Sequence, residues 1–413
     1  MTEVRELEDA ELEQFAGIVR RSFPSFGLDD AALRARYVAR LREQHRDPYA
    51  PYLGAWRAGR LLGGMRCHDF TMNLRGQQIA AAGVGMVAVD IAHKKTHVAH
   101  DMVVAFLARA QARGQHIAIL YPFRPDFYLQ MGFGYGARIH QYRLRLTALP
   151  DGGPRHGVRL LDVADTAAIE ACYARAQART NGLLARRPGE VRQIVADEQR
   201  TVVGYEADGT LRGYLVFLFR RGATFLTHDL DVRELVYDDH DALMALLGFV
   251  RRQADQCERM IWSTHDDAVH LLTDDPRDGS DEIIPHVFHR SSIAGVGLLY
   301  RVIEPRALAA ACGTARFGAG TACVRFVIDD TLVPGIGGAV TVAFADGTLR
   351  PSAAPPDCEV RLSLAMFSSL LIGAARLERL VRYGRATLSD PAWLPLLDAI
   401  LTSAEPPACT TLF

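Results

Sequence analysis

The sequence predicts a multidomain α+β protein with mixed sheets. The chain has 413 residues, which is enough for two to four domains of ordinary size. Strand-like and helix-like segments alternate along it without the regular order of a doubly wound sheet. A Pro/Gly-rich break at residues 149–154 and a change of pattern near Ile303 separate three blocks. We therefore expect domains over residues 1–150, 151–302 and 303–413.

The first block has the clearest pattern. Residues 79–91 are nearly all apolar and rich in β-branched side chains, so they predict a buried central strand. A basic turn at 93–95 leads to a predicted helix over 98–113 that ends at Gly114. The segments that follow predict a strand at 116–120, a short helix at 125–131 closed by Gly132, and a half-buried strand at 138–146.

The second and third blocks also alternate. In the second, the pattern predicts strands at 201–205 and 212–219 that flank a turn at 207–210. It also predicts a helix over 241–259, which is followed by an apolar run at 260–262 and an Asp-rich loop at 264–281. In the third, the pattern predicts strands at 322–329 and 338–345, helices at 363–372 and 375–383, and a tail over 389–413.

The composition excludes several classes of protein. Apolar residues make up 49% and charged residues 23%, as in folded globular proteins. Lys+Arg number 47 and Asp+Glu 48, so the chain lacks the basic excess of a dedicated nucleic-acid binder. No run approaches the ~20 apolar residues of a membrane helix, and the acidic start does not resemble a signal peptide. The seven cysteines are scattered and form no C-x-x-C pair, which indicates reduced thiols in the cytoplasm. Taken together, these features predict a cytoplasmic protein that binds neither nucleic acid nor membrane.

The turn before the predicted helix at 98–113 is a candidate anion site. A helix that begins directly after a buried strand presents free backbone N–H groups and the positive end of its dipole. Lys94 and Lys95 add positive charge beside it. A pyrophosphate fits this arrangement, although two lysines can also simply keep a helix start soluble.

Three short motifs point to a family. They are Val87-x-Val89, Lys94-x-x-His97-x-Ala99 and Tyr128-x-x-x-Gly132-Phe133. Together they resemble the acyl-CoA-binding core of GNAT acetyltransferases, and the three blocks resemble the enhanced intracellular survival (Eis) branch in order and length. The segment 122–128 and the final residue, Phe413, are the more specific similarities. The resemblance covers the whole chain and implies two tandem GNAT-like domains, the second lacking the cofactor motif, followed by a sterol-carrier-protein-like domain.

The resemblance implies that acetyl-CoA, or another acyl-CoA, binds to the first domain. Backbone N–H groups around Val87 and Val89 would face the pantetheine and the acyl carbonyl. The implied phosphate loop comprises Lys94, Lys95, His97, Val98 and Ala99. The family usually has Gln or Arg in place of Lys94 and Gly in place of His97, where a bare backbone approaches the pyrophosphate. Whether His97 weakens or abolishes CoA binding is therefore open.

The resemblance also implies the catalytic groups. Tyr128 matches the residue that protonates the leaving sulfur. Because a tyrosine pKa of ~10 exceeds a thiol pKa of ~8.5, a strong hydrogen bond to the forming thiolate is the better-supported role. The α-carboxylate of Phe413 is implied to reach the active site, where it can bind a cationic amine or take its proton through water. The residues alone are also compatible with a packed aromatic at Tyr128 and a frayed terminus at Phe413.

Residues near the N-terminus are candidates for substrate binding. Phe26, Asp29 and Asp30 combine aromatic and acidic groups that suit a cationic amine, although surface acids are common. His93, His97 and His100 are spaced for one face of a helix, but no carboxylate is interleaved as in H-E-x-x-H. We therefore expect no metal site.

The leading hypothesis is an N-acetyltransferase that acts on a cationic primary amine by direct attack in a ternary complex. An aminoglycoside, a polyamine or a lysine side chain would fit the resemblance. A second hypothesis is a catalytically degenerate GNAT protein that binds a hydrophobic ligand through its third domain. A third is amide formation in a biosynthetic pathway with a different acyl-CoA, or with none. The resemblance also implies a homo-oligomer, with a hexamer built from dimers.

Overall fold

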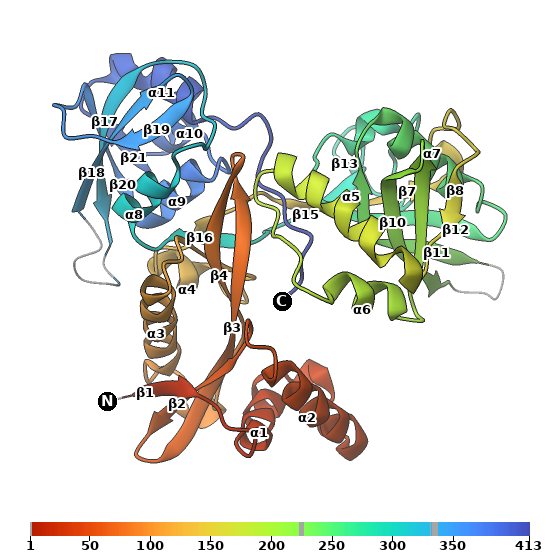
Figure 1. Cartoon of the computed structure of the whole chain (residues 1–413), viewed down its shortest axis with the longest axis horizontal. Helices are drawn as coiled ribbons and strands as arrows, with labels where there is room; N and C mark the ends of the chain where they lie inside the picture. Colours follow the sequence, from red (N-terminus) through yellow and green to blue (C-terminus); the bar gives the residue numbers. More distant parts are fainter. Residues whose placement is uncertain (1, 223–226, 331, 333–337) are drawn as a thin grey trace. The chain divides into compact units, whose positions relative to one another are not determined.

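The structure is a computed structural model that describes residues 2–222, 227–330, 332 and 338–413 (Figure 1). The chain forms two compact units. One comprises residues 1–136, 298–405 and 411–413, and the other comprises residues 137–297 and 406–410. Sequence-distant segments therefore fold together in each unit.

The first unit contains a seven-stranded sheet in the order β1-β2-β3-β4-β5-β16-β6. Its neighbouring strands are antiparallel except β4 and β5, which run parallel. A parallel pair needs a crossover connection, and helix α3 (Val98–Ala112) supplies it. The strands are β1 (Glu3–Glu6), β2 (Tyr52–Arg57), β3 (Arg60–Leu74), β4 (Gln77–Val89), β5 (Ile117–Leu120), β6 (Gly134–Tyr135) and β16 (Leu299–Val302).

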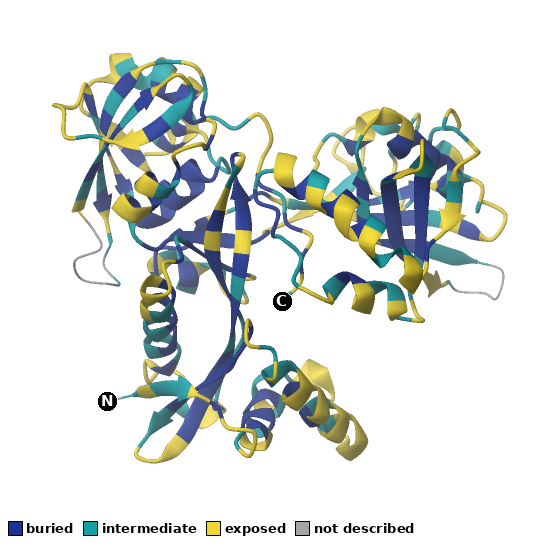
Figure 2. Ribbon diagram, viewed as in Figure 1, coloured by how far each residue is buried: buried dark blue, intermediate teal, exposed yellow. Residues whose placement is uncertain are grey.

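Alternation along the strands divides the core of this sheet between two helical layers. Successive side chains of a strand point to opposite faces. Leu61 and Ala88 belong to the cluster formed with α1 (Leu12–Ser22) and α2 (Ala31–His45), whereas their neighbours Leu62 and Val87 pack with α3 and α4 (Pro125–Gln130). Figure 2 shows the buried residues concentrated on the strands and on the inner faces of these helices. The face with α3 and α4 carries the motifs identified in the sequence.

The same unit contains a five-stranded sheet in the order β19-β18-β17-β20-β21. Helix α9 packs against β6 and β16 of the seven-stranded sheet. There the Ser368 hydroxyl accepts a 2.9 Å hydrogen bond from the Val302 N–H and donates one of 2.8 Å to the Leu364 carbonyl. The elements are α8 (Pro305–Ala311), β17 (Ala322–Asp329), β18 (Gly338–Ala345), β19 (Thr348–Pro351), β20 (Cys358–Ser363), α9 (Leu364–Leu371), α10 (Leu377–Arg382), β21 (Ala386–Leu388) and α11 (Leu394–Leu401).

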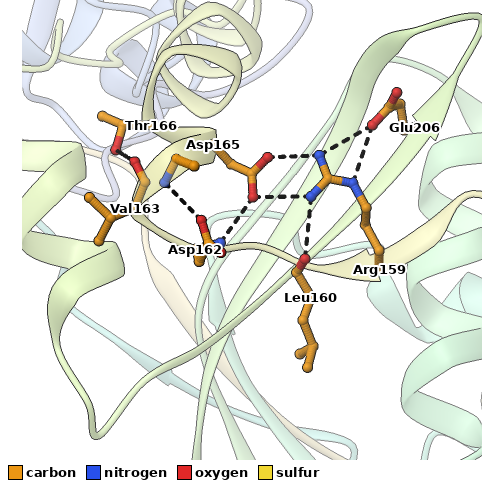
Figure 3. A network of polar contacts seen from close by, with 8 residues as sticks. Arg159, Leu160, Asp162, Val163, Asp165, Thr166 and Glu206 are labelled. Carbon is orange, nitrogen blue, oxygen red and sulfur yellow. Dashed lines mark hydrogen bonds and ion pairs between the residues drawn. The ribbon is translucent and has the colours of Figure 1, made fainter.

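The second unit has its own seven-stranded sheet, in the order β15-β7-β12-β11-β10-β9-β8, with β11 and β12 parallel. At its edge, Arg159 pairs with Asp165 at 2.7 Å and with Glu206 at 3.3 Å, which joins β8 to β9 and to the start of α5 (Figure 3). The elements are β7 (Ile139–Arg145), β8 (Val158–Leu160), α5 (Thr166–Arg179), α6 (Glu190–Ala196), β9 (Thr201–Ala207), β10 (Thr210–Arg221), β11 (His228–Tyr237), α7 (His240–Arg251), β12 (Cys257–Thr264), β13 (Ile283–Ile284), β14 (Phe288–His289) and β15 (Ser292–Gly295).

The division of the chain differs from the boundaries expected at residues 150 and 302. Strand β7, expected in the first domain, pairs with β12 and β15 in the second unit. Residues 299–302, expected to end the second domain, form strand β16, which pairs with β5 and β6 in the first unit. Strand pairing is a long-range property, and a short apolar run fits either sheet equally well.

The helix expected over 241–259 is shorter in the structure. Helix α7 ends at Arg251, and strand β12 begins at Cys257. Cys257 and Met260 are buried in the core of the second sheet. Burial in a strand therefore overrides the local helical pattern of this segment.

Candidate active site

The end of strand β4 has an open edge in the first unit. Its parallel pairing with β5 is confined to Ala81–Gly83 on β4, so the described chain leaves Val84–Val89 paired with β3 alone. A β-bulge interrupts the β3–β4 register here, and Met86 adopts φ 51° within it. A bulge re-aims backbone groups locally. The edge around Val87 and Val89 can accept an extended ligand as if it were another strand.

The loop between β4 and α3 has the geometry of an anion site. Lys95 and His97 both adopt φ 63°, in the left-handed region that favours glycine. His97 stands at the N-cap of the 15-residue helix α3 but supplies no side-chain cap. The N–H groups of its first turn, from Val98 and Ala99, are among those that an α-helix leaves without intrahelical partners.

The side chains of this loop are open to solvent. Lys94, Lys95 and His97 are all exposed, whereas Val98 is buried in the core below them. His97 therefore takes the conformation that glycine would have taken there, with its ring outside the core. The residues present fit a pyrophosphate, with backbone N–H groups and two ammonium groups as its contacts.

Tyr128 lies on the same face as this edge. It is 6% exposed and belongs to the cluster that also holds Val87, Val89 and Val98. Its ring packs on Phe133 with centroids 5.8 Å apart. Burial raises the pKa of the Tyr128 hydroxyl to about 12, so it remains protonated at neutral pH.

Phe413 reaches the bulged strand. A Cβ atom built on Gly85 would lie 3.0 Å from the carboxyl oxygen of Phe413. The Phe413 ring contacts the rings of His68, Phe70 and Tyr121 with centroid separations of 5.3, 5.2 and 5.2 Å. The carboxyl group of Phe413 is thus next to the bulge, and glycine at position 85 leaves room for it.

Sequence reasoning missed the residues that hold this tail. The Tyr121 hydroxyl donates a 2.9 Å hydrogen bond to the Thr411 carbonyl, and Thr411 is buried. His68 is 1% exposed and stacks parallel to Phe70. The one available signal was a histidine flanked by strand residues beside an aromatic residue, which is too common to identify a site.

The candidate substrate residues lie together, but both carboxylates have protein partners. Asp30 caps α2 by accepting a 2.8 Å hydrogen bond from the Leu33 N–H, and Asp29 pairs with Arg20 at 2.6 Å. Phe26 stacks on Phe23, with ring centroids 5.5 Å apart. Their part in substrate binding stays a prediction.

The second unit has a different loop at the corresponding place. Asp239 caps helix α7 by accepting a 2.9 Å hydrogen bond from the Ala242 N–H. Its neighbour Asp238 forms ion pairs with Arg175 at 2.7 Å and with Arg179 at 2.9 Å. Burial alone would raise the pKa of Asp238, but the hydrogen bonds from both arginines lower it overall, so the carboxylate stays ionised and paired with them. The Asp239 carboxylate already occupies this helix start, so a phosphate would meet a bound anion there instead of open N–H groups.

Over the described ranges, no group of three or more His, Cys, Asp or Glu side chains could hold a metal ion. No helix in this part of the chain has the length and apolar character needed to cross a membrane.

Family models match all three parts of the chain. An acetyltransferase (GNAT) domain matches residues 3–136, a second one matches residues 176–295, and a sterol carrier protein domain matches residues 305–410. The N-acetyltransferase Eis of Mycobacterium tuberculosis is 25% identical over 353 residues, which cover 82% of each chain. The chain belongs to the Eis-type GNAT acetyltransferases.

One further protein sequence and one crystal structure are similar to this Eis-type chain. An uncharacterized N-acetyltransferase of Streptomyces coelicolor is 36% identical over 138 residues, which are 32% of this chain and only 33% of that protein. The crystal structure of a GCN5-related N-acetyltransferase from Kribbella flavida has a TM-score of 0.82 at 24% identity, covering 100% of this chain and 98% of its own. The crystal structure and this chain therefore share the same overall fold.

Proposed function

We propose that the protein transfers the acetyl group of acetyl-CoA to a cationic primary amine in its first GNAT domain. The observation that carries this proposal is the carboxyl group of Phe413 beside Gly85, next to the open edge of β4. A carboxylate there attracts an ammonium group and can receive its proton, directly or through water. An aminoglycoside, a polyamine or a lysine side chain meets this requirement.

In the proposed reaction, the neutral amine nitrogen attacks the thioester carbonyl carbon in a ternary complex. The C–S bond of the tetrahedral intermediate then breaks and the sulfur leaves as a thiolate, which takes up a proton from water. The proton that the amine nitrogen loses passes to the Phe413 carboxylate, directly or through water. Backbone N–H groups around Val87 and Val89 stabilise the oxyanion, and the Tyr128 hydroxyl donates a hydrogen bond to the departing sulfur. Full proton transfer from Tyr128 is unfavourable, because burial raises its pKa to about 12 and a thiol pKa is ~8.5.

We assign acetyl-CoA binding to the loop containing Lys94, Lys95, His97, Val98 and Ala99. Its exposed ammonium groups and helix N-terminus support this assignment.

For the amine, Phe26 is the best-supported contact of the three candidates Phe26, Asp29 and Asp30. It belongs to an aromatic group with Phe23 and Tyr37, and Phe123, which is 80% exposed, packs on Phe23. Exposed rings of this kind bind cations.

The experiment is a panel of amines incubated with protein and acetyl-CoA, followed by thiol release and by the mass of the product. Polyamines, aminoglycosides and lysine peptides represent the predicted class, and neutral alcohols and anilines serve as controls. Thiol release that requires a cationic primary amine, with a product heavier by the mass of one acetyl group, supports the proposal. Acetyl transfer to neutral acceptors only, or none with any amine, contradicts it.

A further inference from the structure

A buried ion pair connects the sterol carrier protein domain to the helix that carries Tyr128. Arg301 lies on β16 in the seven-stranded sheet, and Asp330 follows the last residue of β17. Their side chains are 0% and 2% exposed, and Arg301 Nη2 lies 2.8 Å from Asp330 Oδ2. Burying two charges is costly unless each is well paired, so the position of both groups is tightly constrained.

The second bond of Arg301 goes to the end of helix α4. Its Nη1 donates a 2.7 Å hydrogen bond to the Met131 carbonyl. Met131 is the C-cap of α4, and its own N–H donates a 3.0 Å hydrogen bond to the Tyr128 carbonyl. The guanidinium of Arg301 therefore holds the helix end one turn beyond Tyr128.

Gly132 shows how closely the Arg301 guanidinium packs against the end of helix α4. It has φ 81°, and a Cβ atom there would lie 1.7 Å from Arg301 Nη1. The glycine of the Tyr-x-x-x-Gly-Phe motif thus provides both the left-handed turn and the space for the guanidinium. Leu332 adds a third contact, because its N–H donates to Asp330 at 3.1 Å and its side chain packs on the cluster that contains Tyr128.

We propose that Asp330 and Arg301 are positioning residues for acyl transfer: Asp330 fixes Arg301, and Arg301 fixes the end of α4 and with it the Tyr128 hydroxyl. The sterol carrier protein domain then contributes to catalysis without touching the reacting atoms. This inference rests on the function proposed for Tyr128.

The test compares three variants of the full chain. Arg301→Met/Asp330→Leu removes both buried charges together, so that neither is left unpaired. Asp330→Asn leaves the Arg301 charge without a counter-charge but keeps an acceptor oxygen for it, so the guanidinium should stay closer to its place than in the double variant. Asp398→Asn is the matched control, because Asp398 is another poorly exposed acid of the same domain paired with an arginine, Arg376, that does not contact α4.

Steady-state kinetics of each variant are measured with Tyr128 and with Tyr128→Phe. We expect kcat of the double variant to fall about fivefold, with KM for acetyl-CoA within about twofold, because a slightly displaced group loses catalysis before binding. Asp330→Asn shows a smaller fall and Asp398→Asn none. In the Tyr128→Phe background the double variant produces no further loss.

Hydrogen exchange of the peptide over residues 125–133 provides a readout independent of activity. We expect faster exchange there in the double variant and not in Asp398→Asn. Unchanged exchange, or a fall in kcat that is the same with and without the Tyr128 hydroxyl, overturns the inference. If Tyr128→Phe alone keeps wild-type kcat, the proposed role of Tyr128 fails, and the exchange rates then decide whether Arg301 and Asp330 fix α4.

Discussion

The two GNAT domains share a framework but differ where a phosphate would bind. In each, a parallel strand pair is connected by one helix, α3 in the first and α7 in the second, and the strand before the helix takes part in a bulged pairing. The first helix begins at an uncapped His97 beside two exposed lysines. The second begins at Asp239, which caps it, beside the ion-paired Asp238. A few residues in one loop thus separate a potential CoA site from a closed helix start.

The two bulges also differ in what lies beside them. In the first domain, Gly85 leaves room for the carboxyl group of Phe413. In the second, the strand carries Glu234, whose carboxylate accepts hydrogen bonds from Tyr214 at 2.9 Å and from Thr410 at 3.2 Å and pairs with Arg186. Gly85 leaves space beside its bulge for a reacting group, whereas the buried and paired Glu234 carboxylate occupies the space beside the second bulge. We therefore propose acyl transfer in the first domain alone.

Removal of Phe413 is expected to have the largest effect. It shifts the terminal carboxylate back to Leu412, about 3.8 Å along the chain and away from Gly85, so kcat should fall roughly 100-fold, the lower range for loss of a general acid or base. Phe413→Leu keeps the terminal carboxylate and loses only the ring contacts, so it should retain more than about a tenth of wild-type kcat. Initial rates with a saturating amine provide the measurement. A shortened protein as active as Phe413→Leu would remove the carboxylate from the mechanism.

Tyr128→Phe comes next, with an expected fall in kcat of at least about tenfold, since one hydrogen bond to a developing charge is lost. Loss of a packed hydroxyl leaves the ring contacts with Phe133 intact, so thermal unfolding serves as the control. A wild-type rate in a folded variant would contradict the role of Tyr128.

The pH profile tests the same hydroxyl. Burial raises the pKa of Tyr128 to about 12, above the ordinary value of ~10. The neutral hydroxyl is thus favoured in the folded protein, and the stability it contributes is present below pH ~10 and is lost as the pH rises towards about 12. We expect kcat/KM to rise with pH as the substrate amine loses its proton, without a descending limb below pH ~10 in the folded enzyme. A descending limb near neutral pH would indicate another titrating acid.

The lysines of the loop should affect binding more than chemistry. Lys94→Ala/Lys95→Ala is expected to raise KM for acetyl-CoA about fivefold with kcat little changed, because exposed charges each contribute under about 1 kcal/mol. Arg36→Ala is the matched control, since it removes an exposed cation of the same unit on helix α2, outside the loop. An equal effect of both variants would indicate general electrostatic attraction and not a phosphate site.

His97→Gly is expected to have the smallest effect. The left-handed conformation of His97 costs about 1 kcal/mol that glycine does not pay, while glycine gains a similar entropy in the unfolded chain. The free energy of unfolding should therefore change by less than about 1 kcal/mol, and acetyl-CoA affinity should rise about twofold. Chemical unfolding and calorimetry measure the two quantities. A large loss of affinity would mean that the His97 ring itself contacts the ligand.

Local patterns predicted much of the fold. The strands expected at 322–329 and 338–345 have those bounds in the structure, because alternating burial dominates there. The turn at 207–210 lies between β9 and β10, with Asp208 and Gly209 in the left-handed conformation that such turns need. Long-range pairing was not predictable, and this is why the residues of β7 and β16 lie in units other than the domains expected for them.

The candidate site also contains residues that a local pattern can indicate and residues that only long-range contacts bring together. The candidate loop is local, so Lys94, Lys95 and His97 could be proposed from spacing and the resemblance, and their role stays a prediction. The Phe413 tail required the family, since no local pattern places a terminus at Gly85. Arg301 had a weak signal, a lone charge in the apolar run 298–303, but its partners at Met131 and Asp330 are 170 and 29 residues away. Such contacts exist only in the folded chain.

Titration calorimetry of acetyl-CoA into the wild-type chain tests the central claim most directly, because it counts the sites in the two GNAT domains. We expect one site per chain, with micromolar affinity that weakens about fivefold in Lys94→Ala/Lys95→Ala. Two equal sites, or one site that is insensitive to these lysines, would contradict the distinction between the domains.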